Sequence, residues 1–258
     1  MRKNLCIGLT ILFIMSGMAY SAPVELPSAC KGLESIEPSS AEKTNVSAGI
    51  EIDFLSERVL DSLEGTATAT FYTPKVVFSS QGWDSYITVG QVQNIEYGEG
   101  ILGDNGKAAL EDAFTWGAGI SKAFTFETKR PFQIGLDVKY RQAADMDYES
   151  VTVGGITYTK DQLGGTAAAK WAEWQVALLL AGKKSNFVPY AGIKYSDVEA
   201  SAKFTAGGTT YDYGSTNSEE IFGIFAGCSV MPTKQLSIDL QARFIDEEAF
   251  TIGMNYMF

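Results

Sequence analysis

The sequence contains no histidine among its 258 residues. This absence removes the base of Ser–His and Asp–His catalysis and the commonest ligand of transition metals. No cysteine cluster, P-loop or dinucleotide-binding fingerprint is present either. Carboxylate pairs could still act as acid and base, but solvated charges explain such residues more simply. We therefore expect no enzymatic activity, no cofactor and no metal site.

Long hydrophobic runs are also missing. Hydrophobic residues make up 45% of the chain and the mean hydropathy is −0.01. After residue 22, no segment offers the ~20 consecutive apolar residues of a membrane-spanning helix. The apolar run at residues 5–15 follows Arg2 and Lys3 and precedes a stretch of small residues. This pattern predicts a secretory signal peptide over residues 1–22, cleaved between Ala19 and Ala22.

Basic residues and cysteines are scarce. Twenty Lys and Arg face 31 Asp and Glu, so the net charge is −11, and loss of Arg2 and Lys3 with the signal peptide would make it −13. Nucleic acid needs a basic face, so we expect no nucleic-acid partner. Once Cys6 leaves with the signal peptide, Cys30 and Cys228 remain. Two separate thiols are the simpler interpretation, and a bridge between them in an oxidising periplasm is the alternative.

What the sequence does contain is alternation, and it is strictest in the last eleven residues. Large apolar side chains occupy every second position from Phe250 to Phe258, with mostly small or polar residues between them. Period two predicts a strand with one apolar and one polar face. Closure into a barrel would remove the open edge of such a strand. The strand resembles the closing strand of Gram-negative outer-membrane β-barrels. That resemblance implies that Tyr256 and Phe258 are the signal read by the barrel-assembly machinery.

The same alternation recurs after a Pro-containing segment, 23–43, which we expect to be an extended periplasmic lead-in. It predicts an all-β fold over residues 44–258: a transmembrane antiparallel up-and-down β-barrel of about ten strands, with 8–12 possible because Pro74 interrupts one strand. Short and long links alternate, as in barrels with periplasmic turns and extracellular loops. Gly-Gly pairs at 154–155 and 207–208 predict hairpins in two long links. The expected strands are 44–55, 66–79, 85–95, 113–124, 131–142, 170–181, 187–198, 219–231, 235–245 and 248–258.

The polar faces of these strands decide between a soluble and a membrane barrel. Burying so many charges in a dry core would cost several kcal/mol per ion, whereas a membrane barrel turns its apolar face to lipid and its polar face to a wet lumen. In strand 66–79 this rule puts Ala67, Ala69 and Phe71 on the lipid side. Aromatic side chains in phase with the apolar face suit interfacial girdles: Phe114, Trp116, Phe132, Tyr140, Tyr195, Phe250 and Phe258. The charges expected to line the lumen and set its selectivity are Glu51, Asp53, Asp137, Lys139, Arg141, Glu173, Lys194, Asp239 and Arg243.

Both ends of the expected barrel resemble the chlamydial major outer membrane proteins. The segment 243–249 running into Phe258 is similar to the closing part of that porin family, and 48–60 is more faintly similar to its first strand. The resemblance implies a porin-like or structural envelope protein. Members of that family are longer and rich in cross-linking cysteines, so neither the family's pore size nor its disulfides carry over.

The sequence thus predicts an exported multi-pass barrel in the outer membrane of a Gram-negative cell. Its expected partners are outer-membrane lipid, the assembly machinery and small solutes, and its oligomeric state is left open. The favoured function is passive diffusion of ions or small polar solutes through a mixed-charge lumen. The alternative is a non-conducting structural or adhesin-type barrel that displays acidic extracellular loops, because narrow barrels can be filled by side chains.

Overall fold

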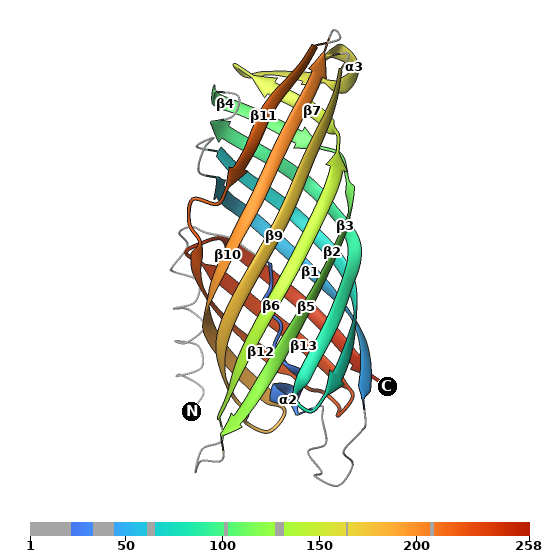
Figure 1. Cartoon of the computed structure of the whole chain (residues 1–258), viewed down its shortest axis with the longest axis vertical. Coiled ribbons are helices and arrows are strands. Elements are labelled where there is room, and N and C mark those ends of the chain that lie inside the picture. The colour runs from blue at the N-terminus through green and yellow to red at the C-terminus, as the bar shows by residue number, and fades with distance from the viewer. Residues whose placement is uncertain are drawn as a thin grey trace.

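Ten strands close into a single antiparallel barrel (Figure 1). The computed structural model describes residues 22–32, 44–60, 65–100, 103–126, 132–163, 165–206 and 209–258. Each barrel strand pairs with its neighbours in chain order, and the pairing of β1 with β14 completes the ring. The all-β transmembrane barrel of about ten strands is confirmed. Its strands are β1 (Asn45–Leu60), β2 (Gly65–Ser80), β3 (Trp83–Gly100), β5 (Ala113–Phe126), β6 (Phe132–Met146), β9 (Gly165–Gly182), β10 (Phe187–Ala206), β12 (Phe222–Val230), β13 (Leu236–Phe244) and β14 (Glu248–Met257).

The terminal strand is the one that closes the ring. Ile252 of β14 lies opposite Ile52 of β1 on one side and Leu240 of β13 on the other. Both edges of β14 are therefore hydrogen-bonded, and the open edge that a C-terminal strand would otherwise expose is removed.

The two ends of the barrel differ in their connections. At one end, here called the turn end, Gln81 and Gly82 join β2 to β3 with φ of 52° and 73°, as a two-residue primed turn requires. At the other end, here called the hairpin end, the strands run on into further elements, seen at the top of Figure 1. They are β4 (Gly103–Leu110), β7 (Tyr148–Val153), β8 (Ile156–Thr159), the short helix α3 (Lys160–Leu163) and β11 (Thr209–Asn217).

One of the two Gly-Gly pairs forms the hairpin that the sequence predicts. Gly154 and Gly155, with φ of 57° and 79°, connect β7 to β8. Glycine adopts such conformations without strain, and a Gly-Gly pair therefore suits a two-residue primed turn. The second pair, at 207–208, lies outside the described residues.

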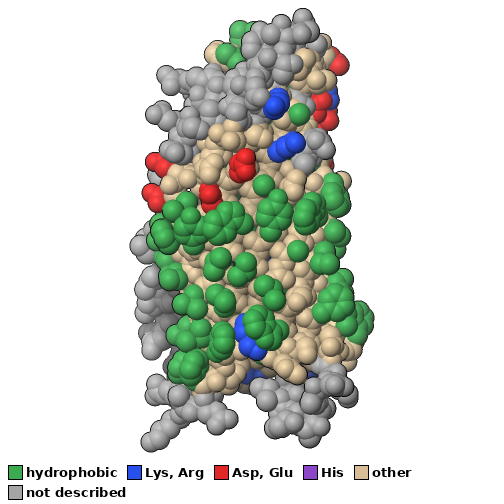
Figure 2. Space-filling view, viewed as in Figure 1, with side chains coloured by type: hydrophobic (Ala, Val, Ile, Leu, Met, Phe, Trp, Pro, Cys, Tyr) green, Lys and Arg blue, Asp and Glu red, His purple; other side chains and the backbone are tan. Residues whose placement is uncertain are grey.

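A belt of apolar side chains surrounds the outside of the barrel. Figure 2 shows it as a broad band, with most of the visible charged side chains above it. On β5 the belt runs from Phe114 to Phe124, a length of about 33 Å along the strand, or about 25 Å along the membrane normal at a tilt of ~40°. That height matches the hydrocarbon layer that a membrane barrel spans.

Aromatic rings line both edges of the belt, one toward the hairpin end and one toward the turn end. Trp116 and Tyr140 lie 5.5 Å apart at the hairpin-end border, and Phe126 and Phe132 lie 5.2 Å apart at the turn-end border. Amphipathic and aromatic rings at two such levels are typical of membrane interfaces. The hairpin-end border consists of Phe54, Phe114, Trp116, Tyr140, Trp174, Tyr195, Phe222 and Phe250, and the turn-end border of Phe78, Trp83, Phe124, Phe126, Phe132, Phe187, Tyr256 and Phe258.

The predicted facing of strand 66–79 is wrong. Ala67, Ala69 and Phe71 are buried, with exposed fractions of 2%, 6% and 2%, and they point into the barrel. The reason is that this part of β2 lies above the belt, where the outside is water rather than lipid. There the barrel has an apolar interior like that of a soluble protein, and the polar face turns outward.

The first described segment lies inside the barrel. Residues 22–32, here called the plug, include the short helix α2 (Ser28–Lys31) near the turn end (Figure 1). Residues 22–31 are all buried. The extended periplasmic lead-in that the sequence predicts over 23–43 is thus described in part, and the described part occupies the lumen. Within the described ranges, no helix has the length and apolarity needed to cross a membrane.

Two isoleucines provide a test of the belt. Ile87 lies in the middle of it and is 56% exposed, whereas Ile156 lies on β8 at the hairpin end and is 58% exposed. Ile87→Arg should lower the free energy of unfolding in lipid vesicles by about 2–4 kcal/mol, because it places a charge in hydrocarbon. Ile156→Arg should change it by less than about 0.5 kcal/mol. Urea titration of the refolded variants measures both, and equal losses would contradict the assigned membrane position.

Candidate functional site: a plugged, ion-paired lumen

The predicted lumen charges all point inward. Eight of the nine are buried, and Asp239 is half-buried. They come from five different strands, β1, β6, β9, β10 and β13, because each strand presents every second residue to the interior. Alternation along single strands therefore located these side chains, whereas the way they pair depends on the register between strands.

Seven charged side chains in the upper half of the lumen form a chain of ion pairs, here called the arginine cluster. Arg141 binds Glu173 at 2.8 Å and Asp53 at 3.0 Å, and Asp53 binds Arg243 at 2.6 Å. Arg243 pairs in turn with Glu247 at 2.5 Å. Charges alternate along the whole chain, so each buried ion has an opposite neighbour. Its members, in order, are Glu173, Arg141, Asp53, Arg243, Glu247, Lys194 and Asp246.

Two members of this cluster come from a turn rather than a strand. Asp246 and Glu247 follow β13 at the hairpin end, where a short turn would normally face water. Their exposed fractions are only 2% and 0%. Lys194 binds both of them, and Ser196 donates a hydrogen bond to Asp246 at 2.6 Å. The turn is thus folded into the lumen by its own carboxylates.

A second set of pairs, here called the lysine cluster, lies nearer the turn end. Glu51 lies 3.8 Å from Lys139 and 3.5 Å from Lys75. Beyond Lys75 the partners belong to the plug, since Lys75 binds Glu25 at 2.6 Å and Lys31 binds Asp239 at 2.8 Å. The plug therefore supplies one anion and one cation to the wall.

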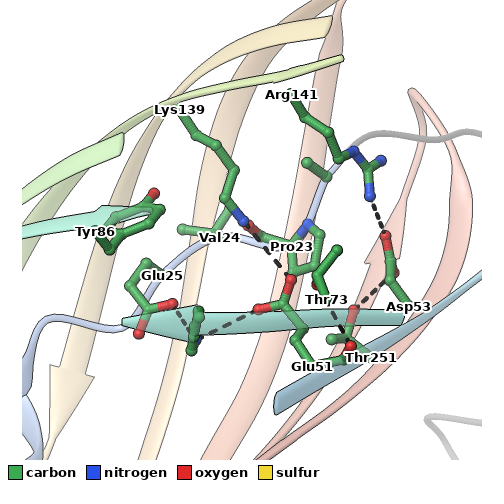
Figure 3. A network of polar contacts seen from close by, with 12 residues as sticks. Pro23, Val24, Glu25, Glu51, Asp53, Thr73, Tyr86, Lys139, Arg141 and Thr251 are labelled. Atoms are coloured by element: carbon green, nitrogen blue, oxygen red, sulfur yellow. Dashed lines mark hydrogen bonds and ion pairs between the residues drawn. The ribbon is translucent and has the colours of Figure 1, made fainter. Parts of the chain in front are cut away.

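Wall side chains also hold the backbone of the plug (Figure 3). Lys139 donates a hydrogen bond to the carbonyl of Pro23 at 2.9 Å. Gln241 clamps Val24, accepting from its N–H at 2.8 Å and donating to its carbonyl at 3.0 Å. The N–H of Glu25 donates to Asp137 at 3.1 Å. Successive backbone groups that could not reach water thus find specific partners.

Wall side chains also form hydrogen bonds with the part of the plug that lies toward the turn end. Asp84 accepts a hydrogen bond from the N–H of Ser28 at 2.6 Å, and Ser79 donates to the Ser28 hydroxyl at 3.1 Å. Gln133 donates to the carbonyl of Ala29 at 3.3 Å. Side chains from several strands around the ring therefore bind the plug.

Apolar layers lie above and below the charges. Near the turn end, Leu26 and Cys30 of the plug pack among Leu179, Tyr190 and Phe225. At the hairpin end an apolar core fills the barrel above the arginine cluster, and it includes Phe71, Tyr97, Met146, Tyr148 and Trp171. A cavity beside the plug has a volume of about 20 Å³ and one in the upper core about 10 Å³. A volume of this size holds about one water molecule.

The cysteines and the terminal aromatics occupy different surfaces. Cys30 is buried within the lumen and Cys228 is on the outward face of β12, and both are free thiols. Tyr256 and Phe258 are 45% and 75% exposed on the outside of β14, with their rings 5.5 Å apart. Their role as an assembly signal stays a prediction.

Sequence reasoning missed several partners of the predicted residues. Lys75 follows Pro74 in the strand with the weakest pattern, and Arg58 lies beyond the expected end of the first strand. The plug shows no alternation at all. Its only local signal is the rarity of large apolar side chains, which is equally typical of a solvated segment.

No protein-family model matches the chain, and no curated protein does. Among solved structures, the translocator domain of the autotransporter NalP from Neisseria meningitidis is 10% identical, with 90% of this chain and 94% of that one covered and a TM-score of 0.45. The outer membrane protease OmpT from Escherichia coli is 11% identical, covering 83% and 96%, at 0.44. The attachment protein Ail of Yersinia pestis is 14% identical, covering 83% and 97%, at 0.31. The similarity to chlamydial porins stays unconfirmed.

Removing one cation from the arginine cluster should be costly. Arg243 is fully buried and binds Asp53 and Glu247. Arg243→Met would leave two buried carboxylates short of a counter-charge, so the free energy of unfolding should fall by about 3–5 kcal/mol. Lys234→Met, on an exposed turn, should change it by less than about 0.5 kcal/mol. Urea unfolding in vesicles distinguishes the two, and a small loss for Arg243→Met would show that the cluster is hydrated.

Proposed function

We propose that this protein is an outer-membrane barrel that is closed while its plug is in place, and that it holds a folded β-structure above the membrane. The observation that carries the proposal is the filled lumen. Two apolar layers enclose paired charges and an eleven-residue segment of the chain, and the cavities beside them admit about one water molecule each. Hydrated ions and polar solutes need a continuous wet path, and the packing of the described residues disfavours one.

The structure above the membrane supports the second half of the proposal. β4, β7 and β8 extend the sheet from β3, and Tyr148 packs in the apolar core beneath them. Lys160 of α3 binds Glu111 at 2.7 Å and Asp147 at 2.8 Å, and hydrogen bonds to these carboxylates raise the pKa of Lys160. A sheet with its own core presents a fixed surface, unlike a long irregular loop.

The exposed surface of this extension offers apolar contact groups. Val153, Ile156 and Tyr158 are 46%, 58% and 38% exposed around the β7–β8 turn. Exposed apolar side chains grouped at the end of a rigid element are typical of contact sites. The adhesin-type or structural role that the sequence left as its alternative is therefore favoured over a passive pore.

A passive pore is the second candidate, and it requires that the plug leave the lumen. Wild-type protein in planar bilayers should give no conductance steps. A chain lacking residues 22–32 should give reproducible steps that scale with salt, because water can then hydrate the wall charges. Deleting residues 33–43 removes the same number of residues outside the plug and should leave the protein silent. Steps from the wild type would overturn the closed-barrel proposal, and silence of the wild type and of both deletion variants would support a permanently closed anchor.

The lumen charges should set selectivity once the plug is removed. The described wall then carries six buried cations and seven buried carboxylates. The half-buried carboxylate of Asp239 adds one more negative charge. This excess of negative charge should make the opened barrel prefer cations. Asp137→Lys should shift the reversal potential in a KCl gradient toward anions, whereas Glu149→Lys, exposed at the hairpin end, should not. An unchanged potential with Asp137→Lys would contradict the predicted role of these residues in selectivity.

A further inference from the structure

The backbone nitrogen of Ala22, at the start of the plug, contacts a charged side chain of the wall. The backbone nitrogen of Ala22 donates a hydrogen bond to the carboxylate of Glu173, and both residues are 1% exposed. The following residue is fixed as well, since Lys139 and Gln175 donate to the carbonyl of Pro23 at 2.9 and 3.2 Å. The nitrogen of Ala22 is therefore held at a defined position deep in the lumen.

Glu173 is the end of the arginine cluster. Along the ion pairs named above the charges alternate from Asp246 to Glu173, and buried Arg58 adds a further cation near Glu173. A cation at the nitrogen of Ala22 would continue the alternation by one step. The whole described lumen also lacks positive charge, because seven buried cations face eight buried carboxylates and half-buried Asp239. A buried carboxylate short of a counter-charge is costly.

The sequence around Ala22 offers a way to create this cation. Signal peptides are cut after a small residue that has another small residue two positions before it. Ala19 and Ser21 satisfy this rule for a cut before Ala22, but Gly17 and Ala19 satisfy it equally for a cut before Tyr20. The sequence alone does not choose between the two bonds, and the contact of the Ala22 nitrogen with Glu173 favours the cut before Ala22.

We propose that the bond between Ser21 and Ala22 is the processing site, and that the α-ammonium group released there binds Glu173 and holds the plug in the lumen. Hydrolysis adds the hydroxyl of water to the carbonyl of Ser21 and a proton to the nitrogen of Ala22, which takes a further proton to become cationic. A backbone amide offers Glu173 one proton and no charge, whereas an ammonium group offers three protons and a full charge. Removal of the signal peptide thereby completes the ion-paired lumen. This inference does not depend on whether the barrel conducts.

The first test is the intact mass of the protein purified from the outer-membrane fraction. A mature chain that begins at Ala22 is expected. A chain that begins at Tyr20, at any other residue, or at the uncut N-terminus would overturn the proposal.

The second test measures how firmly the plug is held. Cys30 is fully buried in the plug, so its rate of reaction with a water-soluble maleimide reports how often the plug leaves the lumen. The outward thiol is removed by Cys228→Ser in all samples. One glycine inserted between Ser21 and Ala22 displaces the ammonium group from Glu173 and should raise the rate at least about tenfold. The same insertion between Ser39 and Ser40 should not.

A third variant separates this ion pair from the other contacts of Glu173. Glu173→Gln should raise the labelling rate of Cys30, and it should add little to the glycine insertion, because both changes remove the same interaction. Glu199→Gln, the same substitution on the exposed face of β10, should have no effect. Equal rates for the two insertions, or effects of insertion and Glu173→Gln that simply multiply, would overturn the proposal even if the processing site is correct.

Discussion

Pairing of opposite charges in a narrow interior is the interaction on which the rest of this structure depends. A ring of ten strands that crosses lipid must turn its polar side chains inward, and a ring of this size leaves little space for bulk water around them. Asp53 has no exposed surface and binds both Arg141 and Arg243. Since an isolated buried ion is costly, each charge has to lie beside one of opposite sign. This requirement explains why the Asp246–Glu247 turn folds inward and why the plug carries both Glu25 and Lys31.

The outer surface of each long strand contacts lipid over one part and water over another. This difference limits how well the facing of side chains can be predicted from the sequence. Within the belt the outside is lipid, so the apolar face is the outer one, and the outward facing that alternation predicts for Phe114, Trp116 and Tyr140 is confirmed. Above the belt the outside is water, and the rule reverses for Phe71. Alternation gives the phase of a strand and not the depth at which lipid ends. For that reason the strands and the inward charges could be predicted, whereas the facing of β2 near the hairpin end could not.

The pairing of the predicted charges could not be derived from the sequence either. Arg141 on β6 and Asp53 on β1 meet across the barrel, which requires the register of every strand between them. The plug is harder still, because the wall recognises it largely through its backbone. Gln241 binds the N–H and carbonyl of Val24, and any residue other than proline would offer the same N–H. Glu25 and Lys31 are the charged side chains of the described segment, and isolated charges in a Pro-containing stretch are typical of solvated chain.

The closed and open forms of this barrel therefore differ in hydration more than in shape. With the plug present, Lys75 binds Glu25 at 2.6 Å, and among its described ion pairs the one with Glu51, at 3.5 Å, would remain if the plug left. Lys139 would lose the carbonyl of Pro23 and keep Glu51 at 3.8 Å. In a dry lumen such losses would be prohibitive. Withdrawal of the plug is thus possible only if water replaces its polar groups at the same time, so that a lumen able to pass solutes must also be a wet one. Whether the barrel serves as an anchor or a pore is decided by the free energy of that exchange, and the wall charges are suited to both states.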